Sequence, residues 1–127
     1  PPSLSPERRR ALVSLREHEK RSCAVKLAAA RDRLAAHDSH IEELSAEIGR
    51  FAVSRSAPIT NVAVAAASLH AGQLDRDRRE KRRSRLVRQL DDLRAERVAL
   101  LAAADQAADE LAAALRALDA VKTPIGS

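Results

Sequence analysis

The feature that most constrains this chain is a pair of heptad patterns, apolar at all but one position each, separated by a proline. Spacings in both patterns alternate between three and four residues, as at the a and d positions of a coiled coil. The first pattern comprises Leu27, Ala30, Leu34, His37, Ile41, Leu44, Ile48 and Phe51. The second comprises Leu86, Leu90, Leu93, Arg97, Leu100, Ala104, Ala107, Leu111, Ala114, Leu118 and Val121. The sequence therefore predicts two long helices, each with one apolar stripe.

Proline and capping residues set the expected ends of these helices. Ser5, Pro6 and Glu7 form a helix start, because serine caps free amides, proline is tolerated first and glutamate complements the helix dipole. Pro58 cannot donate a backbone hydrogen bond and disfavours helix at the residue before it. We therefore expect helix one near residues 5–54, a turn at 55–60 and helix two near 60–121, capped by Thr60 or Asn61 and stopped at Thr123, Pro124 and Gly126.

A short connection would make the two helices antiparallel neighbours. Folding about Ala57 would place Leu86 near Ala29 and leave the C-terminal end of helix two unpaired. Upstream, Leu12 and Leu15 are out of step with the first pattern, and a four-residue stutter would reconcile them. The predicted fold is all-α, an elongated antiparallel two-helix coiled-coil hairpin forming a single domain over residues 1–127. Whether the stripes close within one chain or between chains stays open.

Composition limits what else the chain could be. Alanine supplies 27 residues and Phe51 is the single aromatic residue, which argues against a thick globular core and against strands. Cys23 is the single cysteine, so no internal disulfide can form. No apolar run approaches the roughly 20 residues of a membrane span. We expect a soluble, cytoplasmic protein without membrane insertion and, because the sequence contains no methionine, native residues before Pro1.

Positive charge is concentrated in the segment Arg76–Arg88, which holds eight basic and two acidic residues within a chain of net charge +5. Its extrapolated stripe positions are Arg76, Arg79 and Arg83, so the helices must shift register or splay there. The segment fits a solvated helix face, a surface for an acidic protein, or a nucleic-acid site, which the lack of Trp and Tyr disfavours. This second basic patch comprises Arg76, Arg78, Arg79, Lys81, Arg82, Arg83, Arg85 and Arg88.

Side chains that could support catalysis or bind a metal do not form a recognisable set. His37, Asp38, His40 and Glu43 lie close together in sequence, but a metal needs three or four converging ligands and the opposite helix is rich in arginine. We interpret them as a polar layer in the stripe. Cys23 lies on the predicted stripe, and we expect it to be a small buried residue. We expect no enzyme activity, no catalytic residues, no cofactor and no metal.

The basic N-terminal helix, opening ERRRALVSLREHEKRSCAVKLAAARDRL, together with the alanine- and arginine-rich two-helix pattern, resembles the FliJ/YscO family of type III secretion and flagellar export. The likeness covers nearly the whole chain and rests on architecture, without a short diagnostic motif. Flagellar members commonly carry aromatic residues near the turn, where this chain has Phe51 alone. The resemblance implies a stalk protein whose paired ends insert into the hexameric secretion ATPase while the turn reaches the export gate, with secretion chaperones as further partners.

On this resemblance, the ATPase-binding end would carry a basic face. We define the predicted basic face as Arg8, Arg9, Arg10, Arg16, Lys20, Arg94, Arg97 and Arg116. A basic surface gains speed and orientation of binding from an acidic partner by long-range attraction. The alternatives are a generic structural coiled-coil scaffold and a basic-helix nucleic-acid-binding protein.

Overall fold

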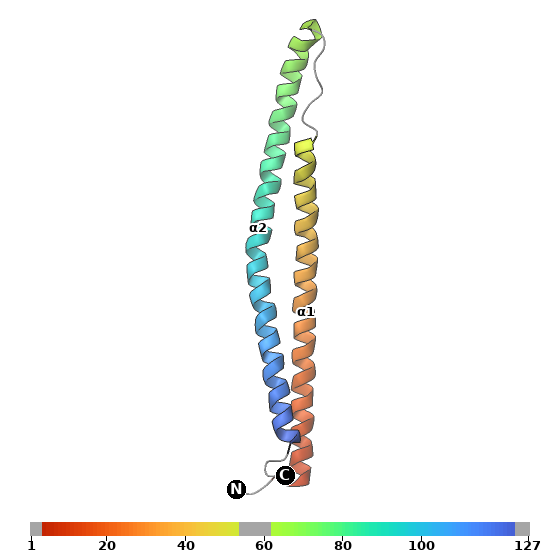
Figure 1. The fold of residues 1–127 in the computed structure, drawn as a ribbon, viewed down its shortest axis with the longest axis vertical. Helices are drawn as coiled ribbons and strands as arrows, with labels where there is room; N and C mark the ends of the chain where they lie inside the picture. The colour runs from red at the N-terminus through yellow and green to blue at the C-terminus, as the bar shows by residue number, and fades with distance from the viewer. Residues whose placement is uncertain (1–3, 54–61, 124–127) are drawn as a thin grey trace. The chain divides into compact units, whose positions relative to one another are not determined.

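A computed structural model describes residues 4–53 and 62–123 of the chain. These residues form two helices, α1 (Pro6–Val53) and α2 (Val62–Lys122), and this part of the chain contains no strand (Figure 1). The all-α, two-helix prediction is confirmed, and both sets of helix bounds agree with it closely. The predicted turn at 55–60 and the caps Thr60 and Asn61 lie outside the described residues.

The start of α1 follows the capping pattern read from the sequence. The side-chain oxygen of Ser5 accepts a hydrogen bond from the backbone amide of Arg8 at 3.3 Å. The carbonyl of Ser5 accepts from the amide of Arg9 at 2.9 Å, the first helical hydrogen bond. Glu7 lies in the first turn, where its charge complements the helix dipole.

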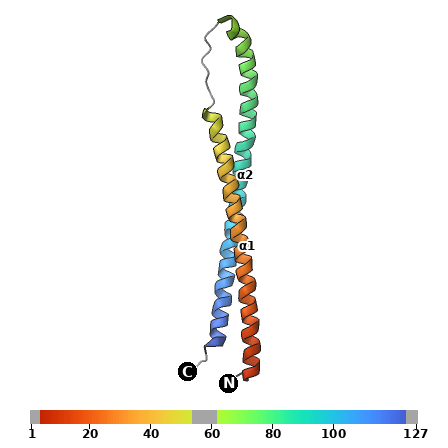
Figure 2. The same ribbon diagram turned by 90° about the vertical axis from the view of Figure 1, so that its right-hand side faces the viewer.

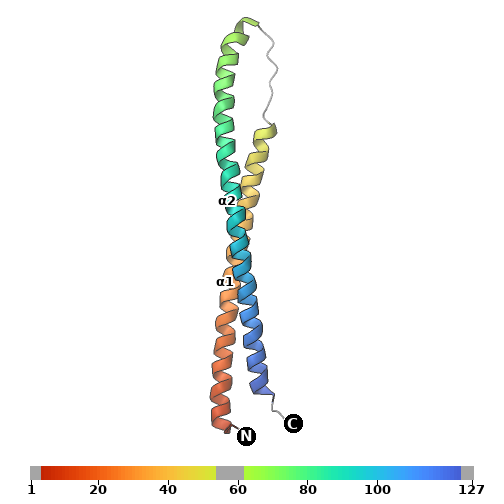
Figure 3. The same cartoon turned by 90° about the vertical axis from the view of Figure 1, so that its left-hand side faces the viewer.

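The helices contribute to two compact units. Unit 1 contains residues Pro1–Ala36 and Val98–Ser127, and unit 2 contains His37–Arg97. In unit 1 the beginning of α1, red in Figures 2 and 3, lies beside the end of α2, shown in blue. In unit 2 the order is again reversed, because His37 contacts Leu93 and Glu47 contacts Arg82. Both units are therefore antiparallel helix pairs.

The predicted heptad patterns form the interior of both units. Every member of the two patterns is buried or half-buried. The most buried residues of unit 1 are Leu27, Ala104, Ala107, Ala114 and Leu118, and those of unit 2 are Leu44 and Leu90. The a and d assignment is confirmed along the whole of both stripes.

The stripe of α1 continues toward the N-terminus without a stutter. Val13, Arg16, Lys20 and Cys23 extend the alternating spacing upstream of Leu27, and all four are half-buried. Long basic side chains can pack their aliphatic stems while their charged ends reach water. Leu15 is instead 51% exposed, and Leu12 is half-buried beside the stripe. The predicted stutter is therefore unnecessary, because charged residues occupy positions that looked like a break.

The predicted register between the helices is wrong. Folding at Ala57 would put Leu86 near Ala29, whereas Arg82, one turn before Leu86, contacts Glu47. The C-terminal end of α2, expected to be unpaired, is paired in unit 1, where Lys122 contacts Glu17 at 3.4 Å.

The cost of burying charge explains why the predicted register is not adopted. Register about Ala57 would turn the stripe positions Arg76, Arg79 and Arg83 against the apolar stripe of α1. Burying such charges without partners costs several kcal/mol. The observed register leaves Arg76 and Arg79 exposed and Arg83 half-buried.

Part of α2 in unit 2 runs past the last residue of α1, Val53 (Figure 1). From Leu69 to Arg82 every residue except the half-buried Gly72 is exposed. Over the described residues, neither helix contains a stretch that is long and apolar enough to cross a membrane.

Candidate partner-binding surfaces

Charge is distributed unequally between the two helices of each unit. In unit 1, residues 6–36 of α1 carry nine basic and four acidic residues. Residues 98–122 of α2 carry two basic and four acidic residues. In unit 2 the signs are reversed. Residues 37–53 of α1 carry one basic and four acidic residues, and residues 69–97 of α2 carry ten basic and six acidic residues. A basic stretch thus faces an acidic one in each unit, which favours the antiparallel arrangement.

Within unit 1, three members of the predicted basic face are half-buried, and one of them bonds to the other helix. Arg9 donates from Nη2 to the carbonyl oxygen of Lys122 at 3.0 Å, satisfying a free carbonyl at the C-terminus of α2. Arg16 pairs with Glu19 at 3.0 Å, and its Nε is buried without a hydrogen-bond partner. Lys20 is half-buried. Arg8, Arg10 and Arg116 are exposed, and these three cations are open to a partner.

Arg94 and Arg97 do not join this surface, because both belong to unit 2. The Nε of Arg97 donates to the Oδ1 of Asp38 at 2.6 Å. This hydrogen bond, and the charge of Asp38, raise the pKa of the Arg97 guanidinium. Arg94 is exposed nearby on α2. Their assignment to the same end as Arg8 followed from the wrong register, and the predicted basic face is divided between the two units.

The predicted polar layer lies at the His37 level of unit 2. The Nε2 of His37 is 2.7 Å from the carbonyl oxygen of Leu93 and 3.6 Å from the carboxylate of Glu96. Asp38 is occupied by Arg97, while His40 and Glu43 are exposed. Across the described ranges, no group of three His, Cys, Asp or Glu side chains could hold a metal ion. Cys23 is half-buried on the stripe of α1 in unit 1.

The second basic patch divides into two sets of side chains. Three arginines on or near the inner side of α2 have carboxylate partners: Arg79 pairs with Asp75 at 3.2 Å, Arg82 with Glu47 at 3.0 Å, and Arg83 with Glu80 at 3.7 Å. The guanidinium of Arg82 also lies 5.7 Å from the ring centre of Phe51. A shallow depression at this place is lined by Glu47, Arg50, Phe51, Arg79 and Arg82.

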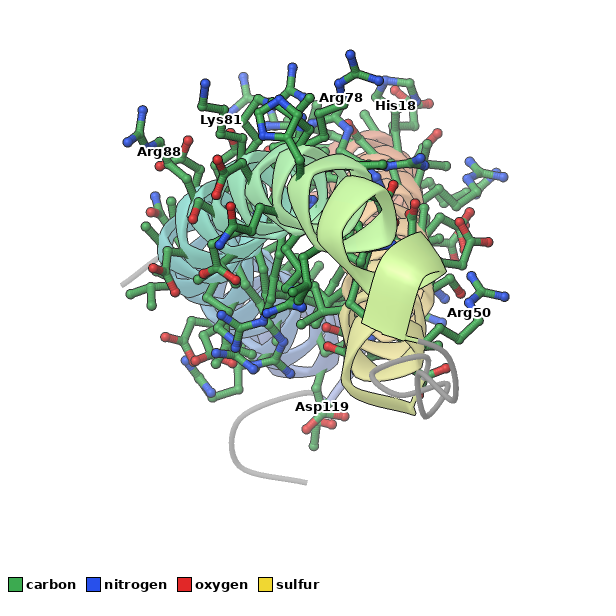
Figure 4. The ribbon with its side chains drawn as sticks, turned by 90° about the horizontal axis from the view of Figure 1, so that it is seen from above. His18, Arg50, Arg78, Lys81, Arg88 and Asp119 are labelled. Carbon is green, nitrogen blue, oxygen red and sulfur yellow. The ribbon has the colours of Figure 1, made fainter. Side chains whose placement is uncertain are left out.

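The other set faces away from α1. Figure 4 shows the side chains of Arg78, Lys81 and Arg88 pointing outward from α2. They are exposed, as are Arg76 and Arg85. The sequence analysis treated all eight cations as one patch. The signal that separates them was present, because Arg78, Lys81, Arg85 and Arg88 repeat the heptad spacing on a face opposite the apolar stripe.

Comparison of the chain with protein-family models, curated proteins and solved structures finds no match.

Proposed function

We propose that this protein is an accessory stalk protein of a type III secretion system, which acts in the cytoplasm and binds the hexameric secretion ATPase through unit 1. In this proposal it stimulates the ATPase, links it to the export gate and contributes no catalytic group of its own. Secretion chaperones are further candidate partners. The resemblance of its sequence to the FliJ/YscO family motivates the proposal.

The observation that carries the proposal is the exposed positive charge of unit 1. Arg8 and Arg10 are exposed in the first turns of α1, and Arg116 is exposed on α2 of the same unit. A packed pair of helices is about 20 Å across, which suits the lumen of a protein ring. An acidic lumen would attract and orient this basic end before contact.

Contacts inside unit 1 support this role by keeping the two helix ends together. Arg9 bonds to the last carbonyl of α2, and Lys122 pairs with Glu17 of α1. An ATPase would therefore meet both ends as one body. Further along α1 in the same unit, Leu15 and Val25 are exposed and offer apolar contacts to the same partner.

The test mixes the full chain with the secretion ATPase from the same organism and measures ATP hydrolysis and ring assembly. We expect stimulation that falls with rising salt, because exposed charges are screened over about 10 Å at 0.1 M salt. The variant R8E/R10E/R116E should lose most of it. The matched control R78E/K81E/R85E reverses three exposed cations of unit 2 and should retain it.

Two results would count against the proposal. Absence of both stimulation and co-migration with the ATPase at low salt would refute the function. Equal loss in the two charge-reversal variants would refute the assignment to unit 1, since net charge alone would then explain binding.

A further inference from the structure

Four exposed cations on α2 form one straight stripe. Arg78, Lys81, Arg85 and Arg88 are spaced three, four and three residues apart, so they lie on one face of the helix over about 15 Å. We call them the outward cation stripe. None forms an ion pair with a described residue, in contrast to Arg79, Arg82 and Arg83 on the inner side. Their charge is therefore not used inside unit 2.

The surroundings of the stripe contain features that a partner could recognise. A shallow depression along this side of α2 is lined by Asp77, Glu80, Lys81, Ser84, Arg85 and Arg88. Leu74 continues the stripe one heptad before Lys81 and is 47% exposed. The surface thus has an apolar position at one end, followed by four cations at coiled-coil spacing.

We propose that the outward cation stripe and Leu74 bind an acidic amphipathic helix of a partner protein. Its carboxylates, at the same three-four-three spacing, pair with the cations, and one apolar side chain packs on Leu74. Helices with matching heptad spacing keep their side chains in step along the contact. Arginine supplies two parallel donors to each carboxylate, which adds direction to the attraction. This inference does not rest on the stalk proposal.

A protein helix fits this surface better than nucleic acid does. Asp77 and Glu80 lie in the same depression as the cations and would repel phosphates, whereas they could accept hydrogen bonds from lysines of a partner helix. The chain contains no Trp or Tyr on which bases could stack. The stripe is also straight and occupies a single face of one helix, which is the geometry that a second helix packed alongside would contact.

The experiment uses the full chain and a synthetic helical peptide that carries one leucine and four glutamates at the matching positions. A second peptide has the same composition with the glutamates distributed around the helix. Binding is followed by fluorescence anisotropy at low and at physiological salt. We expect the matched peptide to bind about tenfold more tightly than the redistributed one, and its affinity to fall as salt rises.

Two variants locate the contact. R78Q/K81Q/R85Q/R88Q should weaken binding of the matched peptide by about tenfold or more. R21Q/K26Q/R31Q/R33Q removes the same charge from exposed positions of unit 1 and should change it by less than about twofold. Circular dichroism checks that both variants keep their helix content. The variant Leu74→Ser, which preserves every charge, tests the apolar end separately and should also weaken the matched peptide.

Four results would overturn the proposal. The two peptides could bind equally, or the two glutamine variants could weaken binding equally. Tighter binding to duplex DNA than to the matched peptide would assign the stripe to nucleic acid. Concentration-dependent self-association that R78Q/K81Q/R85Q/R88Q abolishes would assign it to a second copy of this chain. None of these measurements involves the ATPase, so they stand apart from the test of the stalk function.

Discussion

Units 1 and 2 join the same two helices by different chemistry. Unit 1 buries alanines and leucines of α2, such as Ala107 and Leu118, against α1. Unit 2 has two strongly buried residues, Leu44 and Leu90, and its hydrogen bonds and ion pairs between the helices lie at several levels along the stripe. The described polar contacts between the helices of unit 1 both involve Lys122, at the end of α2. Alanine stripes pack closely, but a shift of one helix along the other would bury similar alanines again. The polar pairs within the stripe of unit 2 therefore favour one register more strongly than the alanines of unit 1 do.

The largest effect should come from the apolar interior of unit 1. Leu118 is 5% exposed, and Leu118→Ala should lower the free energy of unfolding by about 2 kcal/mol, because it leaves a cavity between the helices. The control is Leu115→Ala, where the leucine is 46% exposed and the cost should be below about 0.5 kcal/mol. Urea unfolding followed by circular dichroism measures both. Equal costs would show that unit 1 is not held by its stripe.

A gain in stability is expected where unit 1 carries a charge on its stripe. Arg16→Leu should raise the free energy of unfolding by about 1 kcal/mol, because it removes a buried, unpaired Nε and extends the apolar stripe. The lost pair with Glu19 offsets little of this, since both side chains are partly exposed. Arg21→Leu makes the same chemical change at an exposed position and should give no gain. A destabilised Arg16→Leu protein would contradict the packing described.

Replacing the polar layer would make unit 2 resemble unit 1. His37→Leu should change the free energy of unfolding by only about 0.5 kcal/mol, since a lost hydrogen bond is offset by a gained apolar contact. The alignment of α1 and α2 within unit 2 should become less uniform, because the hydrogen bond at His37 is lost. Spin labels at positions 42 and 89, in a Cys23→Ser background, should show a broader distance distribution than in the parent. Ile41→Leu, one turn away on the stripe, should leave the distribution narrow, and equal broadening would contradict a special role of His37.

The smallest effect concerns the ion pair at the end of α1. Glu47→Gln weakens the contact with Arg82, and we expect a loss of about 0.3 kcal/mol that vanishes at high salt. Glu43→Gln is the matched control, since Glu43 is exposed. Thermal unfolding at two salt concentrations distinguishes the variants. A loss that persists at high salt would mean that the pair is less solvated than the structure indicates.

The sequence was sufficient for the helices but not for their register. Ser5, Pro58 and the two heptad patterns carry local information, so the helix bounds and the buried stripe positions could be read directly. The register, which is the alignment of one helix along the other, has several alternatives that all pair the apolar stripes. It depends on the cost of burying Arg79 and Arg83 against the apolar stripe of α1, and no local pattern along one helix contains that cost.

Surface assignments failed where they depended on register or on charge alone. Arg97 was assigned to the ATPase-binding end, but its partner is Asp38 in unit 2. Arg16 and Lys20 looked like free surface cations, yet both are half-buried on the stripe. A charged residue at a stripe position can pack its stem, so charge in the sequence does not by itself indicate exposure.

Register is the central claim, because it decides which cations face a partner, and chemical cross-linking tests it directly. In a Cys23→Ser background, one cysteine pair replaces Glu47 and Arg82, which are in contact, and a second replaces Glu43 and Ala71, which folding about Ala57 would place opposite each other. A short bismaleimide is added to dilute protein, and the products are identified by mass spectrometry. We predict a cross-link within one chain for the first pair and none for the second. Cross-linking of the second pair, or of the first pair between chains alone, would contradict the account.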